Sequence, residues 1–305
     1  MGETLRNTIC RISQEHIEKN NGTILGECLI DGGRVRGTVP DIPEHPGIME
    51  SPMSDLAIGY VACGHALAGR KPILVVRFQG FNWFNIIGSA NYAAKSKEMS
   101  GIPCPIFIRS VAMDGGFGPV ASGSHYGLIY RMPGIKIAAP STPKEYESVW
   151  NNFIETNDPI YVSEHRATWD IDYELEDSIE KKADITILSI SSTRLNALNA
   201  KKRLSDEGIT TNLIHLPWIK PLDLNKKNDL ILESLLDSKY GGLVTEGDYP
   251  AAAAKNIAYD LMHKTGKRVY ALGLEEKTAG FAPHLDNFPA TPERIYNKIK
   301  EIVCE

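Results

Sequence analysis

A single carboxylate, Asp55, stands at the start of a run built almost wholly from small and apolar residues, PMSDLAIGYVACGHALAG (52–69). Ser54 can cap the first turn of a helix at this point, and Asp55 faces the positive end of the helix dipole. Starting a helix in this way is the commonest role of a first-turn aspartate. A carboxylic acid can also relay a proton in a reaction, if it lies within hydrogen-bond reach of its partner.

The segment after Asp55 predicts a helix that other backbones approach closely, because Ala, Gly and Cys leave few long side chains. A glycine inside a helix costs about 1 kcal/mol relative to alanine, so several of them indicate a gain in close packing. We therefore expect helix 54–69 to be buried against a neighbour, such as another subunit. Arg77, which follows an apolar run, can bind a carboxylate or form an ion pair at a sheet edge.

The strands and helices that must position Asp55 and Arg77 can be predicted from the sequence pattern. Apolar, β-branched runs, which predict strands, alternate with segments of helical pattern. The predicted strands are 71–78, 104–111, 134–140, 159–164, 183–191, 210–216, 241–246 and 267–274. The predicted helices are 54–69, 85–99, 142–155, 192–207, 225–236, 250–264 and one from Thr291. This alternation favours an α/β fold of mostly parallel sheets with helices on both faces.

A charged stretch, DIDYELEDSIEKKAD, divides the pattern into two halves. It has no apolar period and therefore predicts a linker. We place the first domain at residues 1–172, the linker at 173–182 and the second domain at 183–305.

Composition restricts the class of protein. The 305 residues carry a formal net charge of −5, so there is no basic surplus to indicate nucleic-acid binding. No apolar run is as long as a membrane span, and the N-terminus lacks the apolar stretch of a signal peptide. The five cysteines form no CxxC pair and no ligand-like cluster. We expect a cytoplasmic protein with reduced cysteines and no metal site of its own.

Several motifs occur in a characteristic order: PMSDLAIGYVACGHALAGRKPILVVRFQGFNWF, NYAAKSKEMSG, GSHYG and MPGIKIAAPSTPKE, then IKPLD and LVTEGDYP. This order resembles the β-subunit of the 2-oxo-acid dehydrogenase decarboxylase component. That family uses thiamine diphosphate and is related to transketolase. The resemblance implies a pyrimidine-binding domain followed by a transketolase C-terminal domain.

The resemblance also implies a second polypeptide. In this family the β-subunit holds the aminopyrimidine ring of the cofactor at a subunit interface. The diphosphate and its Mg²⁺ are held by an α-subunit that carries a G-D-G…N motif. This chain contains no G-D-G, so we expect an α-subunit partner in an α2β2 assembly, with a lipoyl acyltransferase as a further partner.

Site residues carry over from the family pattern one by one. Asp55 occupies the position of the family's glutamate, whose hydrogen bond to the cofactor ring promotes loss of the thiazolium proton; it is one methylene shorter. Phe81 matches the aromatic residue that stacks on the pyrimidine, or is a core residue. His125, in ASGSHYG, matches the active-site histidine that binds the substrate carboxylate or handles protons, or is a surface residue. Glu27 matches an acid near the cofactor cleft, or is a solvated acid at a strand end.

The chain departs from the family pattern at Ile87 and Gly88, where the family commonly has Asp-Gln. Three functions therefore stay open. The first is a β-subunit of an enzyme that decarboxylates a 2-oxo acid and transfers the fragment to a lipoyl carrier or another acceptor. The second is a carboligase or a transketolase-like ketol transfer, and the third is a catalytically weak, structural β-like subunit.

Overall fold

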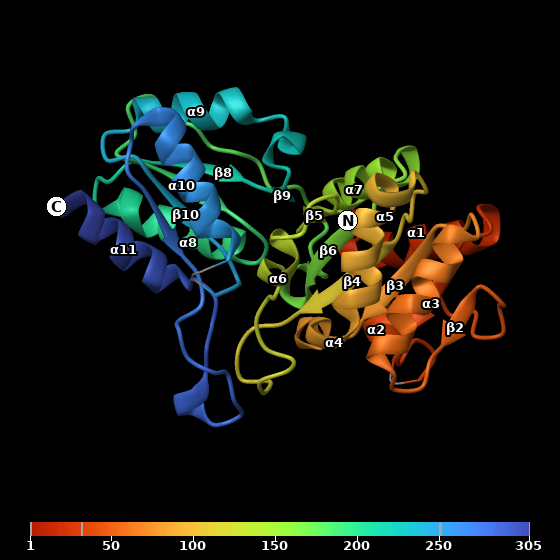
Figure 1. The fold of residues 1–305 in the computed structure, drawn as a ribbon. Helices are drawn as coiled ribbons and strands as arrows, with labels where there is room; N and C mark the ends of the chain where they lie inside the picture. The colour runs from red at the N-terminus through yellow and green to blue at the C-terminus, as the bar shows by residue number, and fades with distance from the viewer. Residues whose placement is uncertain (1, 32, 250–251, 305) are drawn as a thin grey trace. The chain divides into compact units, whose positions relative to one another are not determined.

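The computed structural model describes residues 2–31, 33–249 and 252–304. The chain forms two compact units (Figure 1). Unit 1 comprises Met1–Met113 and Leu128–Glu174, and unit 2 comprises Asp114–Gly127 and Leu175–Glu305. The segment Asp114–Gly127, which lies inside the first domain expected from the sequence, thus groups with the second unit.

Unit 1 is built on a parallel sheet. Its strands pair in the order β2-β1-β3-β4-β6-β5, and β3, β4 and β6 are buried along their whole length. The strands are β1 (Thr23–Gly26), β2 (Ile48–Glu50), β3 (Pro72–Val76), β4 (Phe107–Ala112), β5 (Lys136–Ala138) and β6 (Ile160–His165). Full burial is typical of parallel strands that helices cover on both faces.

The helices of this half of the chain include one that the sequence analysis missed. They are α1 (Leu5–Lys19), α2 (Arg34–Gly37), α3 (Asp55–Leu67), α4 (Asn82–Ile86), α5 (Ala93–Ser100), α6 (Gly127–Tyr130) and α7 (Pro143–Glu155). Thr4 caps α1 by accepting the backbone N–H of Asn7 at 3.3 Å, and Leu5, Ile9 and Ile12 form its buried face. That cap and the apolar spacing are the signal by which α1 could have been predicted.

The predicted continuous helix 85–99 is wrong in detail. Between α4 and α5 the chain forms a π-helix, η2 (Ile87–Tyr92). The residues Gly59 and Gly88 explain its position, since a Cβ at Gly59 would lie 2.8 Å from the Asn85 carbonyl oxygen and one at Gly88 would lie 2.9 Å from the Tyr60 nitrogen. Gly59 of α3 therefore serves close packing within the chain.

Unit 2 contains a second parallel sheet, with the strand order β11-β10-β7-β8. The α/β fold with two parallel sheets is thus confirmed. Its strands are β7 (Ile185–Ser189), β8 (Thr211–His215), β10 (Gly242–Thr245) and β11 (Val269–Leu272), with the short β9 (Trp218–Lys220). Its helices are α8 (Thr193–Asp206), α9 (Asn228–Asp237), α10 (Ala253–Thr265) and α11 (Pro292–Cys304).

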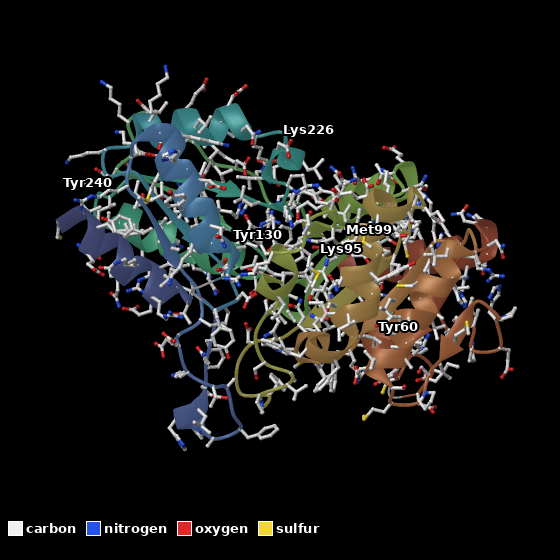
Figure 2. All side chains as sticks on the ribbon, in the orientation of Figure 1. Tyr60, Lys95, Met99, Tyr130, Lys226 and Tyr240 are labelled. Atoms are coloured by element: carbon white, nitrogen blue, oxygen red, sulfur yellow. The ribbon has the colours of Figure 1, made fainter. Side chains whose placement is uncertain are left out.

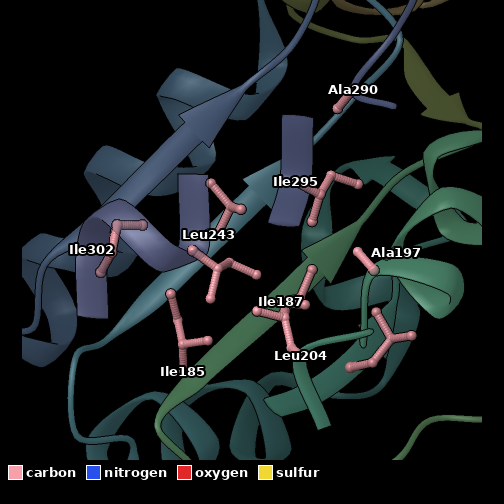
Figure 3. Close-up of a cluster of buried hydrophobic side chains, with 11 residues drawn as sticks. Ile185, Ile187, Ala197, Leu204, Leu243, Ala290, Ile295 and Ile302 are labelled. Atoms are coloured by element: carbon pink, nitrogen blue, oxygen red, sulfur yellow. The ribbon is translucent and has the colours of Figure 1, made fainter. Parts of the chain in front are cut away.

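One face of this sheet is covered by α8 and α11. Figure 3 shows Ile187 and Leu243 of the sheet meeting Leu204 of α8 and Ile295 of α11. Each of these side chains is completely buried, and burial of one such aliphatic side chain stabilises the fold by about 1.5–3 kcal/mol. This cluster is the main core of the unit on that face.

No helix among the described residues is long and apolar enough to cross a membrane.

A glycine at the start of β10 gives a test of this packing. Gly241 has φ +86° and a Cβ there would overlap the carbonyl oxygen of Arg268, whereas Gly266 has φ +68° with open space around it. Gly241→Ala should lower the free energy of unfolding by about 3 kcal/mol or more, because strain and overlap add. Gly266→Ala should cost about 1 kcal/mol from backbone strain alone. Denaturant unfolding measures both, and equal effects would contradict the overlap.

Candidate active site

Three carboxylates gather at one edge of the unit 1 sheet. Glu27 directly follows β1, Glu50 ends β2, and Asp55 begins α3. Strands β1 and β2 are parallel and pair with Gly26 opposite Glu50, so their carboxyl ends meet. In open α/β sheets this edge is where ligands bind.

Glu50 is occupied by the backbone of the loop after β1. Its carboxylate accepts the backbone N–H groups of Cys28, Leu29 and Ile30 at 2.5, 2.6 and 2.8 Å. These three bonds fix the backbone of residues 28–30 to the end of β2. Glu50 therefore shapes the loop that follows Glu27.

Glu27 fixes the start of α3. Its Oε1 accepts the backbone N–H of Ser54 at 2.8 Å, while the side chain of Ser54 makes no capping hydrogen bond. The expectation that Ser54 caps the helix is therefore wrong, because Glu27 binds the backbone at that point. Glu27 is half-buried and not simply a solvated acid.

The proton affinities of Glu27 and Asp55 are both increased. Burial raises the pKa of Glu27, and the nearby charges of Asp55 and Glu50 add to the effect. Burial likewise raises the pKa of Asp55. A carboxyl group with a raised pKa is better able to donate a hydrogen bond or a proton near neutral pH. The chemistry expected of Asp55 is thus compatible with its surroundings.

Arg77 and Phe81 come from the segment after β3, the strand that neighbours β1. Gly26 pairs with Val75, so the residues that follow, Glu27 and Arg77, emerge at the same edge. The Phe81 ring is partly exposed and lies 6.2 Å from the ring of Phe78. The Arg77 guanidinium lies over Phe78, 5.7 Å from its centroid. Among the described residues Arg77 has no ion-pair partner, so the sheet-edge pair suggested by the sequence does not form.

His125 belongs to the other unit and is buried, with 8% of its surface exposed. Its Nε2 lies 3.2 Å from the carbonyl oxygen of Ser122, and its ring lies 6.1 Å from that of Tyr249. Burial lowers its pKa, which favours the neutral imidazole at pH 7. The alternative that His125 is a plain surface residue is therefore wrong.

A buried acid pair beside His125 was missed by the sequence analysis. Glu246 accepts the Tyr126 hydroxyl at 2.9 Å and the Ala254 backbone N–H at 3.0 Å. Asp248 accepts the backbone N–H of Gly127 at 2.8 Å. The two acids hold residues 126 and 127, so they position the loop that carries His125.

Burial is also the main cause of a raised pKa in both acids. It raises the pKa of Asp248 to about 7 and that of Glu246 well above its ordinary value, where the charge of Asp248 adds to the effect. The signal in the sequence was the motif LVTEGDYP, which places two acids directly after a buried strand. Its composition could have identified them as candidates.

Among the residues that the structure covers, no group of three or more His, Cys, Asp or Glu side chains is placed to hold a metal ion.

Comparison with known proteins decides the family. Residues 32–170 match the transketolase pyrimidine binding domain, and residues 177–294 match the transketolase C-terminal domain. The chain belongs to the transketolase-like family. The resemblance drawn from its motifs is therefore confirmed, as are the two domain types that it implied.

Relatives within the transketolase-like family include β-subunits of dehydrogenases. The pyruvate dehydrogenase E1 component subunit beta of Bacillus subtilis is 26% identical over 259 residues, which cover 79% of this chain and 78% of that protein. The 2-oxoisovalerate dehydrogenase subunit beta of the same species is 25% identical, with 95% of each chain covered. A split gene transketolase, solved as an inactive β4 tetramer, is similar in fold with a TM-score of 0.70 at 17% identity, over 100% of this chain and 99% of that one.

The buried acid pair generates a prediction about pH. A carboxyl whose pKa is raised in the folded state binds its proton more tightly there than in the unfolded chain, so stability falls as the pH rises. Between pH 4 and 7, the window set by the ordinary and raised pKa values of Asp248, each such group contributes a loss of up to about 1.4 kcal/mol per pH unit. Asp248→Asn should make the urea-unfolding free energy less dependent on pH. The exposed Asp206→Asn serves as the control, and an unchanged slope in Asp248→Asn would contradict the assignment.

Proposed function

We propose that this chain is the β-subunit of a two-chain, thiamine-diphosphate-dependent enzyme that decarboxylates a 2-oxo acid and transfers the acyl or aldehyde fragment. The observation that carries the proposal is the placement of Asp55 at the start of α3. There Glu27 fixes the helix start by accepting the Ser54 N–H, and burial raises the Asp55 pKa. The names of the relatives, which are β-subunits of dehydrogenases of 2-oxo acids, support the same class of reaction.

The donor set of unit 1 fits the aminopyrimidine end of thiamine diphosphate. Asp55, whose pKa is raised by burial, would donate a hydrogen bond to a ring nitrogen, and Phe81 offers a partly exposed aromatic face for stacking. Glu27 contributes through the Ser54 N–H, which holds Asp55 in place. When bound, thiamine diphosphate supplies the carbon nucleophile that attacks the 2-oxo carbonyl.

In this proposal a partner α-subunit binds the diphosphate and its Mg²⁺, because the sequence has no G-D-G motif. Arg77 and His125 of this chain contact the substrate. Arg77 offers a guanidinium that is free of carboxylate partners among the described residues, and an arginine binds a carboxylate in a bidentate manner. His125, neutral and buried, can hold or pass on a proton.

Asp55→Asn tests the proposed proton role. In the reconstituted complex with the α-subunit, this variant should keep its fold and much of its cofactor binding. The exchange of the thiazolium C2 proton for deuterium should slow by orders of magnitude, because an amide cannot relay the proton. Asp55→Glu, the conservative control, should retain or increase the exchange rate.

The same measurement separates the alternatives. An unchanged exchange rate in Asp55→Asn would show that Asp55 only stabilises the start of α3 and takes no part in proton transfer. A parent complex that binds the cofactor but neither exchanges the proton nor consumes pyruvate or longer 2-oxo acids would favour the structural β-like subunit. Product formed from an aldehyde or ketose acceptor, without a lipoyl carrier, would favour the carboligase.

We also propose that helix α3 packs against a second copy of this chain, in an assembly of two such chains with two α-subunits. Its side chains Leu56 and Tyr60 are half exposed (Figure 2 labels Tyr60), and Trp83 and Phe84 of α4 are 61% and 59% exposed. Helices α3 and α4 are in contact, so these residues belong to one apolar region. Exposed apolar regions rich in aromatic residues are typical of subunit interfaces.

Gly64→Leu tests this interface without disturbing the single chain. Gly64 is exposed on α3 and a Cβ there meets no atom of the chain within 4 Å, so leucine should leave the stability of the chain unchanged or slightly higher. Close approach of a second helix would be blocked, so the assembly should dissociate in analytical ultracentrifugation. Gly59→Leu, which overlaps the Asn85 carbonyl, should instead damage the fold itself. Normal assembly of Gly64→Leu would place the interface elsewhere.

A further inference from the structure

Two buried cysteines that lie far apart in sequence contact each other in unit 1. Cys63 is on α3 and Cys104 is in the loop between α5 and β4, and they are 4% and 0% exposed. The thiol of Cys63 forms a hydrogen bond with the thiol of Cys104, and the Cys104 Sγ lies 3.9 Å from the Cys63 carbonyl oxygen. All five cysteines lie in the described part of the chain, and none of them forms a disulfide.

Prolines restrict the backbone on both sides of Cys104. Pro103 precedes it and Pro105 follows it, and each proline ring locks its own φ angle. A residue that precedes a proline is also restricted to extended conformations. The backbone that carries the Cys104 thiol is therefore stiff, although Cys104 belongs to neither a helix nor a strand.

The side chain of Cys63 is directed toward η2 and away from the exposed side of α3. Its Sγ donates a hydrogen bond to the carbonyl oxygen of Gly88 in η2 at 3.0 Å. A thiol has a single hydrogen to donate, so the Gly88 oxygen and the Cys104 sulfur compete for it. Loss of that hydrogen would remove a donor from both partners.

The two thiols differ in reactivity. The hydrogen bond from Cys63 lowers the pKa of Cys104, although burial acts in the opposite direction. The same hydrogen bond, together with burial, raises the pKa of Cys63. Since the thiolate is the nucleophilic form of cysteine, we expect Cys104 to react first with an oxidant. Cys63 is then in place to react with the oxidised sulfur.

A pocket of about 300 Å³ in unit 1 includes Cys104 among its lining residues, together with the small residues Ala93, Ala94 and Gly134. One water molecule occupies roughly 30 Å³ in the liquid, so the pocket has ample room for hydrogen peroxide, which is only slightly larger than water. Cys104 itself is completely buried beside this pocket. A small peroxide therefore needs only a local fluctuation to reach the sulfur, whereas a bulky thiol reagent needs the unit to open.

We propose that Cys63 and Cys104 are an oxidative modification site, at which hydrogen peroxide converts the two thiols into an intrachain disulfide. In the first step the Cys104 sulfur attacks one peroxide oxygen and the O–O bond breaks. The other oxygen leaves as water with the thiol proton, and Cys104 becomes a sulfenic acid. In the second step the Cys63 sulfur attacks the Cys104 sulfur, the S–O bond breaks, and the hydroxyl leaves as water with the Cys63 proton. The two thiols lose two electrons, and one peroxide is reduced to two water molecules.

The disulfide changes the contacts of α3. It ties α3 to the loop before β4, and it consumes the S–H group that Cys63 donates to Gly88. Helix α3 begins with Asp55, so oxidation acts on the helix that carries the proposed proton relay. This consequence for the reaction rests on the proposed function, whereas formation of the disulfide depends on the two sulfurs alone.

Peptide mapping of the full chain tests the site. The reduced protein is treated with hydrogen peroxide, its remaining thiols are blocked with N-ethylmaleimide in denaturant, and the monomer band of a non-reducing gel is digested with trypsin. Trypsin places Cys63 in peptide 37–70 and Cys104 in peptide 98–109, and neither peptide contains another cysteine. The two peptides should appear joined, and a dithiol reductant should separate them.

Single substitutions separate the roles of the two sulfurs. Cys63→Ala should abolish the joined peptide and leave Cys104 with one or two added oxygen atoms, since no second thiol reacts with its sulfenic acid. Cys104→Ala should also abolish the joined peptide, and it should leave Cys63 unoxidised. Cys304→Ala, the control at an exposed cysteine, should form the joined peptide in the same yield as the parent.

Two outcomes would overturn the proposal. One is the absence of the joined peptide from the oxidised parent, and the other is its presence only in a dimer band, which would place the bond between two chains. The parent measurement is decisive by itself if a variant fails to fold. In the native protein dithionitrobenzoate, a bulky aromatic disulfide, should label the exposed Cys28 and spare Cys104. Equal labelling of Cys28 and Cys104 would contradict the selective access of a small oxidant.

Discussion

Backbone N–H groups from two separate segments converge on the carboxylates of Glu27 and Glu50. This hydrogen bonding sets the geometry of the candidate active site in unit 1. Glu50 orders the loop after β1 and Glu27 orders the start of α3. Asp55 owes its position to the second of these bonds, because the side chain of Ser54 does not cap the helix. The acids at this edge thus divide into those that hold backbone and one that is available for chemistry.

In the second unit, carboxyl groups also hold a loop in place by accepting hydrogen bonds, but there the acids are buried. Glu246 accepts the Tyr126 hydroxyl and Asp248 accepts the Gly127 backbone N–H, so these two acids hold the two residues that follow His125. Since both acids are buried, their protons are retained over a wider range of pH than those of solvent-exposed acids. The His125 loop is therefore fixed by groups whose charge state depends on pH, and its position is tied to that charge state.

Much of the fold was predictable from residue patterns. The features that were not predicted depend on contacts between residues that are distant in sequence. Strands such as β3 and β6 were predicted to within a few residues, because buried β-branched runs are distinctive. The π-helix η2 was not predicted, since it packs against α3 through Gly59 and Gly88, which lie far apart in sequence. Asp55, Phe81 and His125 were proposed from the family pattern rather than from their spacing.

The contact between α3 and η2 restricts how this site can change in evolution. The family pattern used in the sequence analysis has a glutamine at the position of Gly88, but any residue with a Cβ there would approach the Tyr60 backbone to 2.9 Å. A Gly88→Gln mutation would therefore clash with main chain, which cannot move aside as a side chain can. Glutamine fits at this position only after one of the two helices has shifted. New specificities would therefore have to arise at other positions around the site.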